Sequence, residues 1–328
     1  MKAFLRLITC VAVAACAAAP LAALSQAYPT KTVRIIVPHS AGGPADVPPR
    51  AMAPLLAQTL GQPFVVENRI GADGIIGAEA VAKSTPDGHT LLSTSNGVTV
   101  VNPAIHSKLP YDTSRDFVPI IQTGTLYSVV IAHPSVPANS MRELISVLKA
   151  KPESISYGTY GQITLAYFLV QWMKNKMNVA FYEVPYKGST YALQALVSGE
   201  VQTASYALGS AAQLIQAGKL KPLAVNSRER LASLPNVPTL RELNIDVDFR
   251  SWFGFYAPVA TPMSIVRRLN SEIAKLLADP TFKAKFIAAQ GFETDFPTGA
   301  SPEQFAACLR TEQEEFAKLV KVVGVKPE

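Results

Sequence analysis

Short apolar runs alternate with longer amphipathic segments along nearly the whole chain. The short runs are rich in Val, Ile, Tyr and Phe and are bounded by Gly or Pro, which predicts β-strands. They lie at 33–37, 64–68, 90–95, 128–133, 155–159, 181–186, 201–206, 221–226 and 252–258. The segments between them carry helix start signals, because Ser140, Thr239 and Ser301 precede Glu or Gln by three residues, while Thr261 and Asp279 precede proline. This alternation predicts an α/β fold with mostly parallel sheets.

Three loops are candidates for binding a ligand. In sheets of this class, ligands bind beyond the carboxyl ends of strands, where loops lead into helices. Residues 38–46, 93–99 and 158–164 occupy such positions and are rich in Gly, Ser, Thr or Asn. The first two precede a long extended segment near 124–133 and the third follows it, which suits a protein of two lobes with a cleft between them.

The first 27 residues are typical of an export signal. Lys2 and Arg6 form a basic start, residues 7–24 are almost wholly apolar, and small residues lead to a cleavage site at Ala27. The sequence VAAC ending at Cys16 also resembles a lipobox, so a lipid anchor on Cys16 stays open as an alternative. No later run reaches the roughly 18 to 20 apolar residues of a membrane span. We therefore expect a soluble, periplasmic protein.

Charge and cysteine content exclude several classes of function. Loss of Lys2 and Arg6 with the signal lowers the net charge from +6 to +4, and Lys and Arg do not cluster. This argues against nucleic acid and membrane surfaces but fits attraction of small anions. Cys308 alone remains after residue 27, and the four histidines show no HxxxH or HxH spacing. We therefore expect no disulfide, metal or other cofactor.

The stretch VPHSAGGPADVPPR, residues 37–50, allows a catalytic interpretation. His39, Ser40 and Asp46 lie close together, but adjacent His and Ser in an extended segment point to opposite sides. The chain also has no GxSxG motif. A secreted serine hydrolase using Ser40 is the alternative from another class of function, and it predicts ester turnover that is lost in Ser40→Ala.

Nucleotide binding has little support in the same stretch. The glycines after the first predicted strand lack the Gly-Lys-Ser/Thr ending of a phosphate loop. Residues 71–77 read GADGIIG, which is GxxGxxG and not GxGxxG. Glycines that let a helix start and pack closely explain this pattern.

Capture of a small anion is the remaining functional interpretation of residues 37–50. The three prolines of the stretch place the helix start near Pro48 and donate no hydrogen bond. A cradle would use the amides of Ala41, Gly42 and Gly43 and the hydroxyl of Ser40. Because backbone geometry dominates such a cradle, we expect Ser40→Ala to weaken binding less than Gly43→Val. A tight turn without a ligand fits the same residues.

The order of motifs resembles the Bug family, the periplasmic substrate-binding receptors of tripartite tricarboxylate transporters. The resemblance spans essentially the whole chain after the signal. It is carried by VRIIVP, AGGPAD with Arg50, residues 60–92 and 102–117, VPYKGS, AGKLKPLAV, LPNVPTL, SWFGFYAP and the closing VVGVKPE.

The resemblance implies a periplasmic binding protein-like Venus flytrap without catalysis, in which hinge strands join two α/β lobes. One lobe would comprise residues 28–125 plus 252–328 and the other residues 126–251. A monomer would hold a small carboxylate and close to present a surface to the membrane components of the transporter. A sensor that feeds a signalling partner requires the same closure and stays open. The implied contacts are Ser40, Ala41, Gly42, Gly43, Ser95 and Asn96 in the first lobe, with Thr159, Gly161, Thr164 and Tyr206 in the second.

Departures from the family pattern bear on the ligand. Residues 157–161 read YGTYG instead of a sequence like YGSAG, Tyr167 lies where a His tends to fall, and Tyr206 replaces a common Asp. A Tyr hydroxyl cannot supply a negative charge to pair with an ammonium. We therefore expect a non-amino carboxylate, with an aromatic or apolar body suggested by Tyr160, Tyr167 and Tyr206.

Three further residues have structural interpretations. Lys187 in VPYKGS is read as a surface charge and not as a ligand contact. Trp252 and Phe253 are read as packing residues at the junction of the lobes, with stacking on a ligand as the alternative.

Overall fold

The computed structural model describes residues 28–231, 233–247, 249–288, 291–294 and 297–325. The predicted signal peptide and the lipobox at Cys16 lie outside these residues. Within the described ranges, no helix has the length and apolar character needed to cross a membrane.

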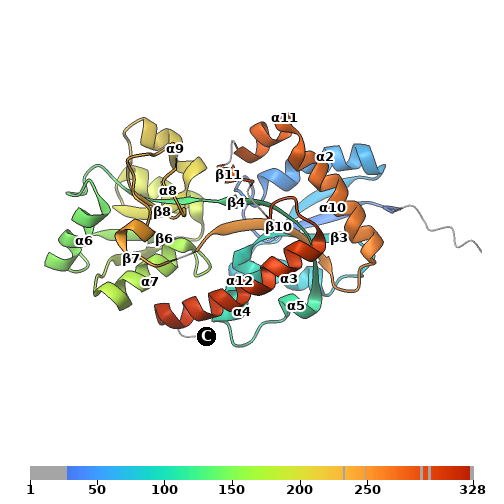
Figure 1. Cartoon of the computed structure of the whole chain (residues 1–328), viewed down its shortest axis with the longest axis horizontal. Helices are drawn as coiled ribbons and strands as arrows, with labels where there is room; N and C mark the ends of the chain where they lie inside the picture. The colour runs from blue at the N-terminus through green and yellow to red at the C-terminus, as the bar shows by residue number, and fades with distance from the viewer. Residues whose placement is uncertain (1–27, 232, 248, 289–290, 295–296, 326–328) are drawn as a thin grey trace, which may run out of the picture.

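Two β-sheets organise the molecule, one in each half (Figure 1). The first has the order β11-β4-β10-β3-β1-β2. Its strands are β1 (Val33–Val37), β2 (Phe64–Asn68), β3 (Thr90–Ser95), β4 (Phe117–Leu126), β10 (Ser251–Pro258) and β11 (Phe292–Glu293). The second has the order β7-β6-β8-β5-β9. Its strands are β5 (Ser128–Ala132), β6 (Ser156–Thr159), β7 (Tyr182–Pro185), β8 (Thr203–Ala207) and β9 (Lys221–Val225).

Both sheets are mixed, so the prediction of mostly parallel sheets is wrong. Strand β1 pairs in parallel with β2 and β3, and β6 pairs in parallel with β7 and β8. Strand β10, however, runs antiparallel to β3 and β4, and β5 runs antiparallel to β8 and β9. Strand β11 also pairs antiparallel with β4. The chain enters the second sheet through β4 and β5 and returns to the first through β10.

Helices cover the faces of both sheets, and their start signals have different outcomes. Ser140 caps α6 through the amide of Glu143, and Ser301 forms a full capping box on α12. Thr261 does not cap α10, which begins at Met263 after an uncapped proline. The helices are α2 (Val47–Leu60), α3 (Ile75–Ala82), α4 (Asn102–Ile105), α5 (Thr113–Asp116), α6 (Met141–Ala150), α7 (Leu165–Met177), α8 (Ser189–Ser198), α9 (Leu208–Gln216), α10 (Met263–Ala278), α11 (Pro280–Phe282) and α12 (Pro302–Val323). The 3₁₀-helices are η1 (Ala72–Gly74) and η3 (Arg241–Leu243), and the π-helices are η2 (Gly97–Val101) and η4 (Lys283–Ile287).

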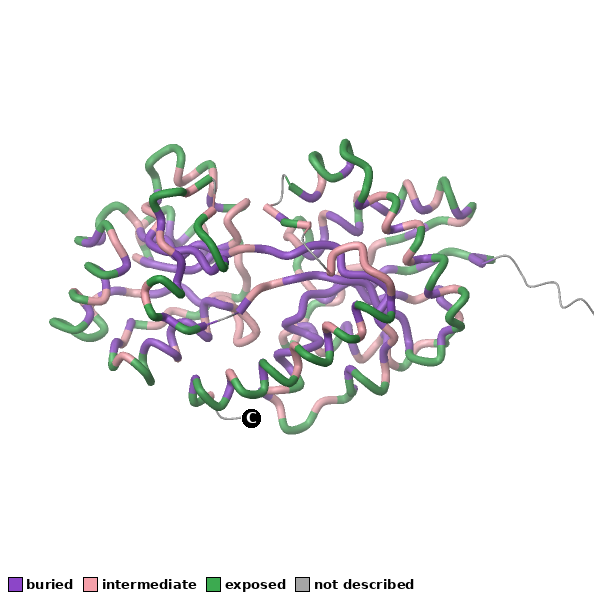
Figure 2. The backbone as a smooth tube through the Cα atoms, in the orientation of Figure 1, coloured by how far each residue is buried: buried purple, intermediate pink, exposed green. Residues whose placement is uncertain are grey.

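The two lobes are joined by a pair of extended segments that cross side by side. Strand β4 pairs with β10 along its length, and Figure 2 shows both strands largely buried. Beyond them, the Asn226 side chain accepts a hydrogen bond from the Ser128 amide at 2.6 Å and donates one to the Phe249 carbonyl. One buried amide therefore links the outgoing and the returning segment, which makes this the natural position of a hinge.

Helix α12 is a third link between the lobes. It runs below β10 in Figure 1 from the first lobe toward α7 in the second. Phe316 on α12 packs against Phe168 of α7, with ring centroids 5.0 Å apart, and against Phe249 at 5.7 Å. The Asn175 side chain donates to the carbonyl of Val323 at 2.5 Å. Because α12 touches both lobes, the division into residues 28–125 plus 252–328 and 126–251 stays a proposal.

Candidate ligand-binding site

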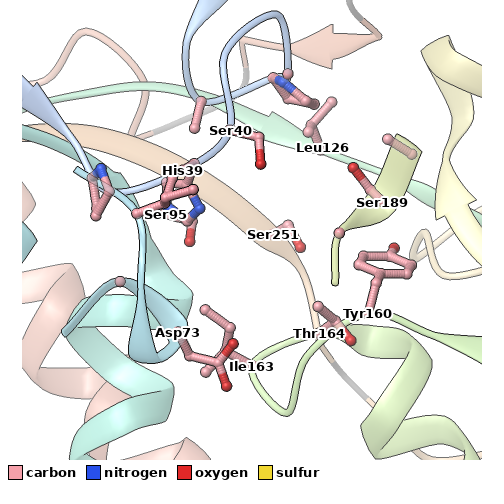
Figure 3. A pocket seen from close by; sticks show the side chains of 18 of the residues that line it. His39, Ser40, Asp73, Ser95, Leu126, Tyr160, Ile163, Thr164, Ser189 and Ser251 are labelled. Atoms are coloured by element: carbon pink, nitrogen blue, oxygen red, sulfur yellow. The ribbon is translucent and has the colours of Figure 1, made fainter. Parts of the chain in front are cut away.

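A cavity of about 510 Å³ lies between the two sheets, beyond the carboxyl ends of their parallel strands. The loops that follow β1, β2 and β3 line it from one side, and those that follow β6, β7 and β8 line it from the other. Figure 3 shows side chains from both walls pointing into the same space. The three loops selected from the sequence all contribute to this lining.

The loop after β1 is held in place by a buried carboxylate. Asp46 is 2% exposed and accepts hydrogen bonds from the Gly42 amide at 3.0 Å, from Asn68 at 2.8 Å and from two nitrogens of Arg50 at 2.7 and 3.0 Å. Burial works against ionisation of this carboxyl, but the hydrogen bonds outweigh it and keep its pKa below the ordinary value. Asn68 also donates to the His39 carbonyl at 3.0 Å. Strand β2 thus fixes the loop that follows β1.

This network corrects the predicted amide cradle. Gly42 adopts a φ of 76°, which favours glycine, but its amide is used by Asp46 and the residue does not line the cavity. Ala41 and Gly43 do line the cavity, and no described residue accepts a hydrogen bond from their amides. Helix α2 begins at Val47, close to the predicted start, with Pro48 and Pro49 in its first turn. The available cradle therefore has two amides and not three.

His39, Ser40 and Asp46 do not form a catalytic relay. The Nε2 atom of His39 lies 3.1 Å from the hydroxyl of Thr94, and Asp46 is directed toward Arg50. Burial lowers the pKa of His39 to about 4, so its imidazole is neutral near pH 7. The Ser40 side chain lines the cavity and makes no hydrogen bond within the described residues. Its hydroxyl is therefore available to a ligand.

The end of β3 contributes one hydroxyl that lines the cavity and one structural group. Ser95 lines the cavity, and its hydroxyl has no partner among the described residues. Asn96 also lines the cavity, but its side chain donates to the Arg250 carbonyl at 2.7 Å and to Glu312 at 3.2 Å. Its amide oxygen accepts from the Trp252 amide at 3.4 Å. The predicted contact at Asn96 is therefore engaged chiefly in holding the crossing segment and α12.

The predicted residues after β6 serve mainly to build the second wall. Thr159 is buried in β6 and does not line the cavity, and neither does Gly161. Thr164 lines the cavity, but its hydroxyl donates to the Gly161 carbonyl at 2.9 Å and accepts from the Tyr167 amide as the cap of α7. The loop lies at the cavity as the sequence pattern predicts, whereas the Thr164 hydroxyl has its partners inside the protein.

Two tyrosines give the second wall an aromatic surface. Tyr160 and Tyr206 both line the cavity, with ring centroids 5.2 Å apart. The Tyr160 hydroxyl donates to the Ser205 carbonyl at 2.9 Å, and the Tyr206 hydroxyl donates to the Ser189 carbonyl. Both hydroxyl protons are thus used within the lobe. Tyr206, which is predicted as a ligand contact, therefore offers its ring to the cavity and not its hydroxyl proton.

Several lining residues were missed by the sequence interpretation. Asp73, in η1 after β2, and Ser189, at the start of α8 after β7, both point into the cavity in Figure 3. Lys187 is exposed, as predicted, but it also lines the cavity. Phe253 lines the cavity, and its ring centroid lies 5.3 Å from that of Phe292. This position fits both packing at the junction of the lobes and contact with a ligand. Asp73 and Ser189 both follow predicted strands, at 64–68 and 181–186, and ligands bind beyond the carboxyl ends of such strands. The same rule therefore predicts the segments after β2 and β7 as candidates.

The two walls touch where one partner is a glycine. A Cβ atom on Gly97 would lie 2.7 Å from Cδ1 of Ile163 in the opposite lobe, and one on Gly161 would lie 2.9 Å from a carboxylate oxygen of Asp73. Real Cβ atoms essentially never approach so closely. The absence of side chains at these glycines is what permits the lobes to come together around the cavity.

Two mixed α/β lobes, joined by crossing strands around a shared cavity, define the two-lobed fold of periplasmic binding proteins. Residues 49–324 match the family model described as tripartite tricarboxylate transporter family receptor. The chain belongs to this receptor family.

Named relatives agree with this assignment. BugT from Bordetella pertussis (strain Tohama I) is 34% identical over 311 residues, which cover 94% of each chain. The solved structure of the periplasmic binding protein BugD is 30% identical with a TM-score of 0.82, covering 92% of this chain and 100% of the other. A structure described as R. palustris Rpa4515 with adipate is 31% identical with a TM-score of 0.83 and the same coverage. The resemblance to the Bug proteins is thus confirmed.

Proposed function

We propose that this protein is the extracytoplasmic solute-binding receptor of a tripartite tricarboxylate transporter and captures a small carboxylate between its lobes. The observation that carries the proposal is the cavity between the lobes, whose first wall offers the amides of Ala41 and Gly43 beside the hydroxyls of Ser40 and Ser95. Backbone amides and hydroxyls are suitable donors to a carboxylate. The relative solved with adipate supports this class of ligand.

The second wall supports the finer description of the ligand. The rings of Tyr160 and Tyr206 suit an apolar or aromatic body, and the exposed Lys187 adds a positive charge at the cavity. Tyr206 provides no negative charge for an α-ammonium group, which favours a non-amino carboxylate. The absence of a relay among His39, Ser40 and Asp46 favours binding without turnover.

Residues 1–27 would direct the receptor to the periplasm, where we infer that it acts as a monomer. Ligand that contacts both walls favours the closed arrangement by its difference in affinity between the open and closed states. The closed form would then be the one that the membrane components of the transporter recognise.

Mass spectrometry of small molecules released from freshly purified protein tests the proposal. A thermal-shift panel of mono-, di- and aromatic carboxylates follows, with the corresponding amides as uncharged controls. At a hundred times the dissociation constant, a ligand stabilises the folded state by about 2.7 kcal/mol. We expect a carboxylate to raise the unfolding midpoint and to compact the protein in small-angle scattering. If amides and carboxylates were equally ineffective, the proposed function would be wrong.

A further inference from the structure

An unusual turn directs the side chain of Asp73 into the ligand cavity. Asp73 has φ 48° and ψ 37°, and Ala72 before it has φ 46°, in a region that side-chain-bearing residues seldom adopt. The buried side chain of Asn102 donates to the Asp73 carbonyl at 3.0 Å, and the Gly74 amide donates to the Gly71 carbonyl at 3.0 Å. These bonds hold the main chain of the turn, so that the carboxylate faces the cavity.

The Asp73 carboxylate has no hydrogen-bond or ion-pair partner in the part of the chain that the structure describes. It approaches Gly161 of the opposite lobe, where φ is 119° and an added Cβ would lie 2.9 Å from the carboxylate. Figure 3 shows it beside Ile163, at the side of the cavity away from Ser40. Lobe closure therefore leaves a fixed negative charge at one end of the ligand space.

The charges around the cavity suit a ligand with one carboxylate. Among the described lining residues, Asp73 and Lys187 are the aspartate and the lysine, and His39 is neutral near pH 7. A first carboxylate can bind the donors of the loop after β1 and benefit from Lys187. A second carboxylate at the far end would meet Asp73, and like charges brought together in a closed cleft repel strongly. A hydroxyl at that end would instead donate a hydrogen bond to Asp73.

We propose that Asp73 determines specificity by disfavouring dicarboxylates and by accepting a hydrogen bond from monocarboxylates that carry a terminal hydroxyl. This inference rests on the proposed function, since it presumes that the cavity binds a carboxylate. It predicts a preference opposite to that suggested by the adipate in the related structure.

Calorimetry with matched ligands tests the role of Asp73. The probes are straight-chain dicarboxylates of four to eight carbons, such as adipate, each paired with the ω-hydroxy monocarboxylate of the same length, such as 6-hydroxyhexanoate. We expect the tightest-binding length to favour the hydroxy acid by about tenfold or more in the unmodified protein. Asp73→Asn keeps the shape and tolerates positive φ, and it should reduce this ratio about tenfold, mainly by tightening the dicarboxylate.

Two controls keep the result interpretable. Glu79 lies on α3 outside the cavity, where its carboxylate pairs with Lys83. Glu79→Gln removes this carboxylate and should leave the ratio of the two affinities unchanged. Asp73→Gly removes the charge and relieves the positive φ, and it replaces Asp73→Asn if that variant does not fold. An unchanged ratio in a folded Asp73 variant that still binds carboxylates would overturn the specificity role alone. Failure of the unmodified protein to bind any acid of the panel would overturn the proposed function and this inference with it.

Discussion

On the wall formed by the loops after β1 and β3, the amides of Ala41 and Gly43 and the hydroxyls of Ser40 and Ser95 keep their hydrogen-bonding capacity. On the opposite wall, the hydroxyls of Tyr160, Thr164 and Tyr206 are already used. Thr164 caps α7, and the hydroxyls of two tyrosines donate to backbone carbonyls. Lys187, Ser189, Thr190 and Ser210 also line this wall, and their side chains have no hydrogen-bond partner within the described residues.

The difference separates two tasks within one cleft. We expect the polar groups of the first wall to bind the carboxylate first, and the network around Asp46 fixes the loop after β1 beforehand. The second wall sets two tyrosine rings, whose hydroxyls are bound within the lobe, beside polar side chains that include Lys187 and Ser189. We expect the rings to contribute shape and dehydration when this wall closes over the bound ligand. We therefore expect that substitution of Ser40 or Ser95 changes affinity through lost contacts, whereas substitution of Thr164, whose hydroxyl is already bonded, acts through stability.

Asp46→Ala is the substitution that should damage the first wall most. It removes a buried carboxylate and leaves the Gly42 amide, Asn68 and Arg50 without their shared acceptor. Loss of such a buried acceptor costs about 2–3 kcal/mol of unfolding free energy, and the disordered loop should lower carboxylate affinity about tenfold or more. Urea unfolding and calorimetry measure the two effects. Unchanged affinity would mean that the loop geometry does not depend on Asp46.

Gly97→Val should prevent closure while leaving the first wall intact. Gly97 begins η2 without a positive φ, so its backbone accepts a side chain, but the new Cβ would collide with Ile163 across the cleft. We expect affinity to fall about tenfold and the compaction in small-angle scattering to disappear. Ile163→Ala in the same protein should restore much of both, since it removes the atoms that clash. No rescue in the double variant would place the defect inside the first lobe.

The carboxyl-end loops could be read from the sequence because the strands before them are sharply bounded. Residues 33–37, 64–68 and 90–95 form strands with the predicted limits. Strand β4 was recognised only in part, because Pro119 and polar residues interrupt its apolar pattern. The structure accommodates Pro119 at an irregularity in the pairing with β10, and the buried Gln122 donates to Thr125 at 3.3 Å. The pairing of β4 with β10, a strand far away in the sequence, has no local signal.

The site residues that the sequence did not reveal depend on tertiary contacts. The GADGIIG pattern shows glycines that could start a helix, but the direction of Asp73 follows from a turn held by Asn102, 29 residues away. Likewise, Gly42 looks available to a ligand until Asp46 is seen to use its amide. Donor types could be predicted, whereas their free or occupied state required the folded partners.

His39→Gln should change how the stability of the protein depends on pH. Burial places the folded-state pKa of His39 at about 4, below its ordinary value of 6.5. The neutral form therefore contributes stability that is fully present above about pH 6.5 and is lost as the pH falls toward 4. Between pH 7 and 5, the unfolding free energy should fall less in His39→Gln than in the unmodified protein. Because the ring is only partly buried, we expect this difference to be on the order of 1 kcal/mol. Urea unfolding at the two pH values measures this difference. An equal loss of unfolding free energy in His39→Gln and the unmodified protein would contradict the lowered pKa of His39.

Ser40→Ala and Thr164→Val compare one hydroxyl from each wall and should have the smallest effects. Ser40 has no partner within the described residues, so its loss should remove one ligand hydrogen bond and weaken binding about threefold, without changing stability. Thr164 caps α7, so Thr164→Val should cost about 1 kcal/mol of stability and leave affinity within about twofold. Calorimetry and urea unfolding of both variants test this division. Ser40→Ala should lower affinity alone, and Thr164→Val should lower stability alone. If Thr164→Val weakened binding more than Ser40→Ala did, the polar recognition would have to be assigned to the second wall.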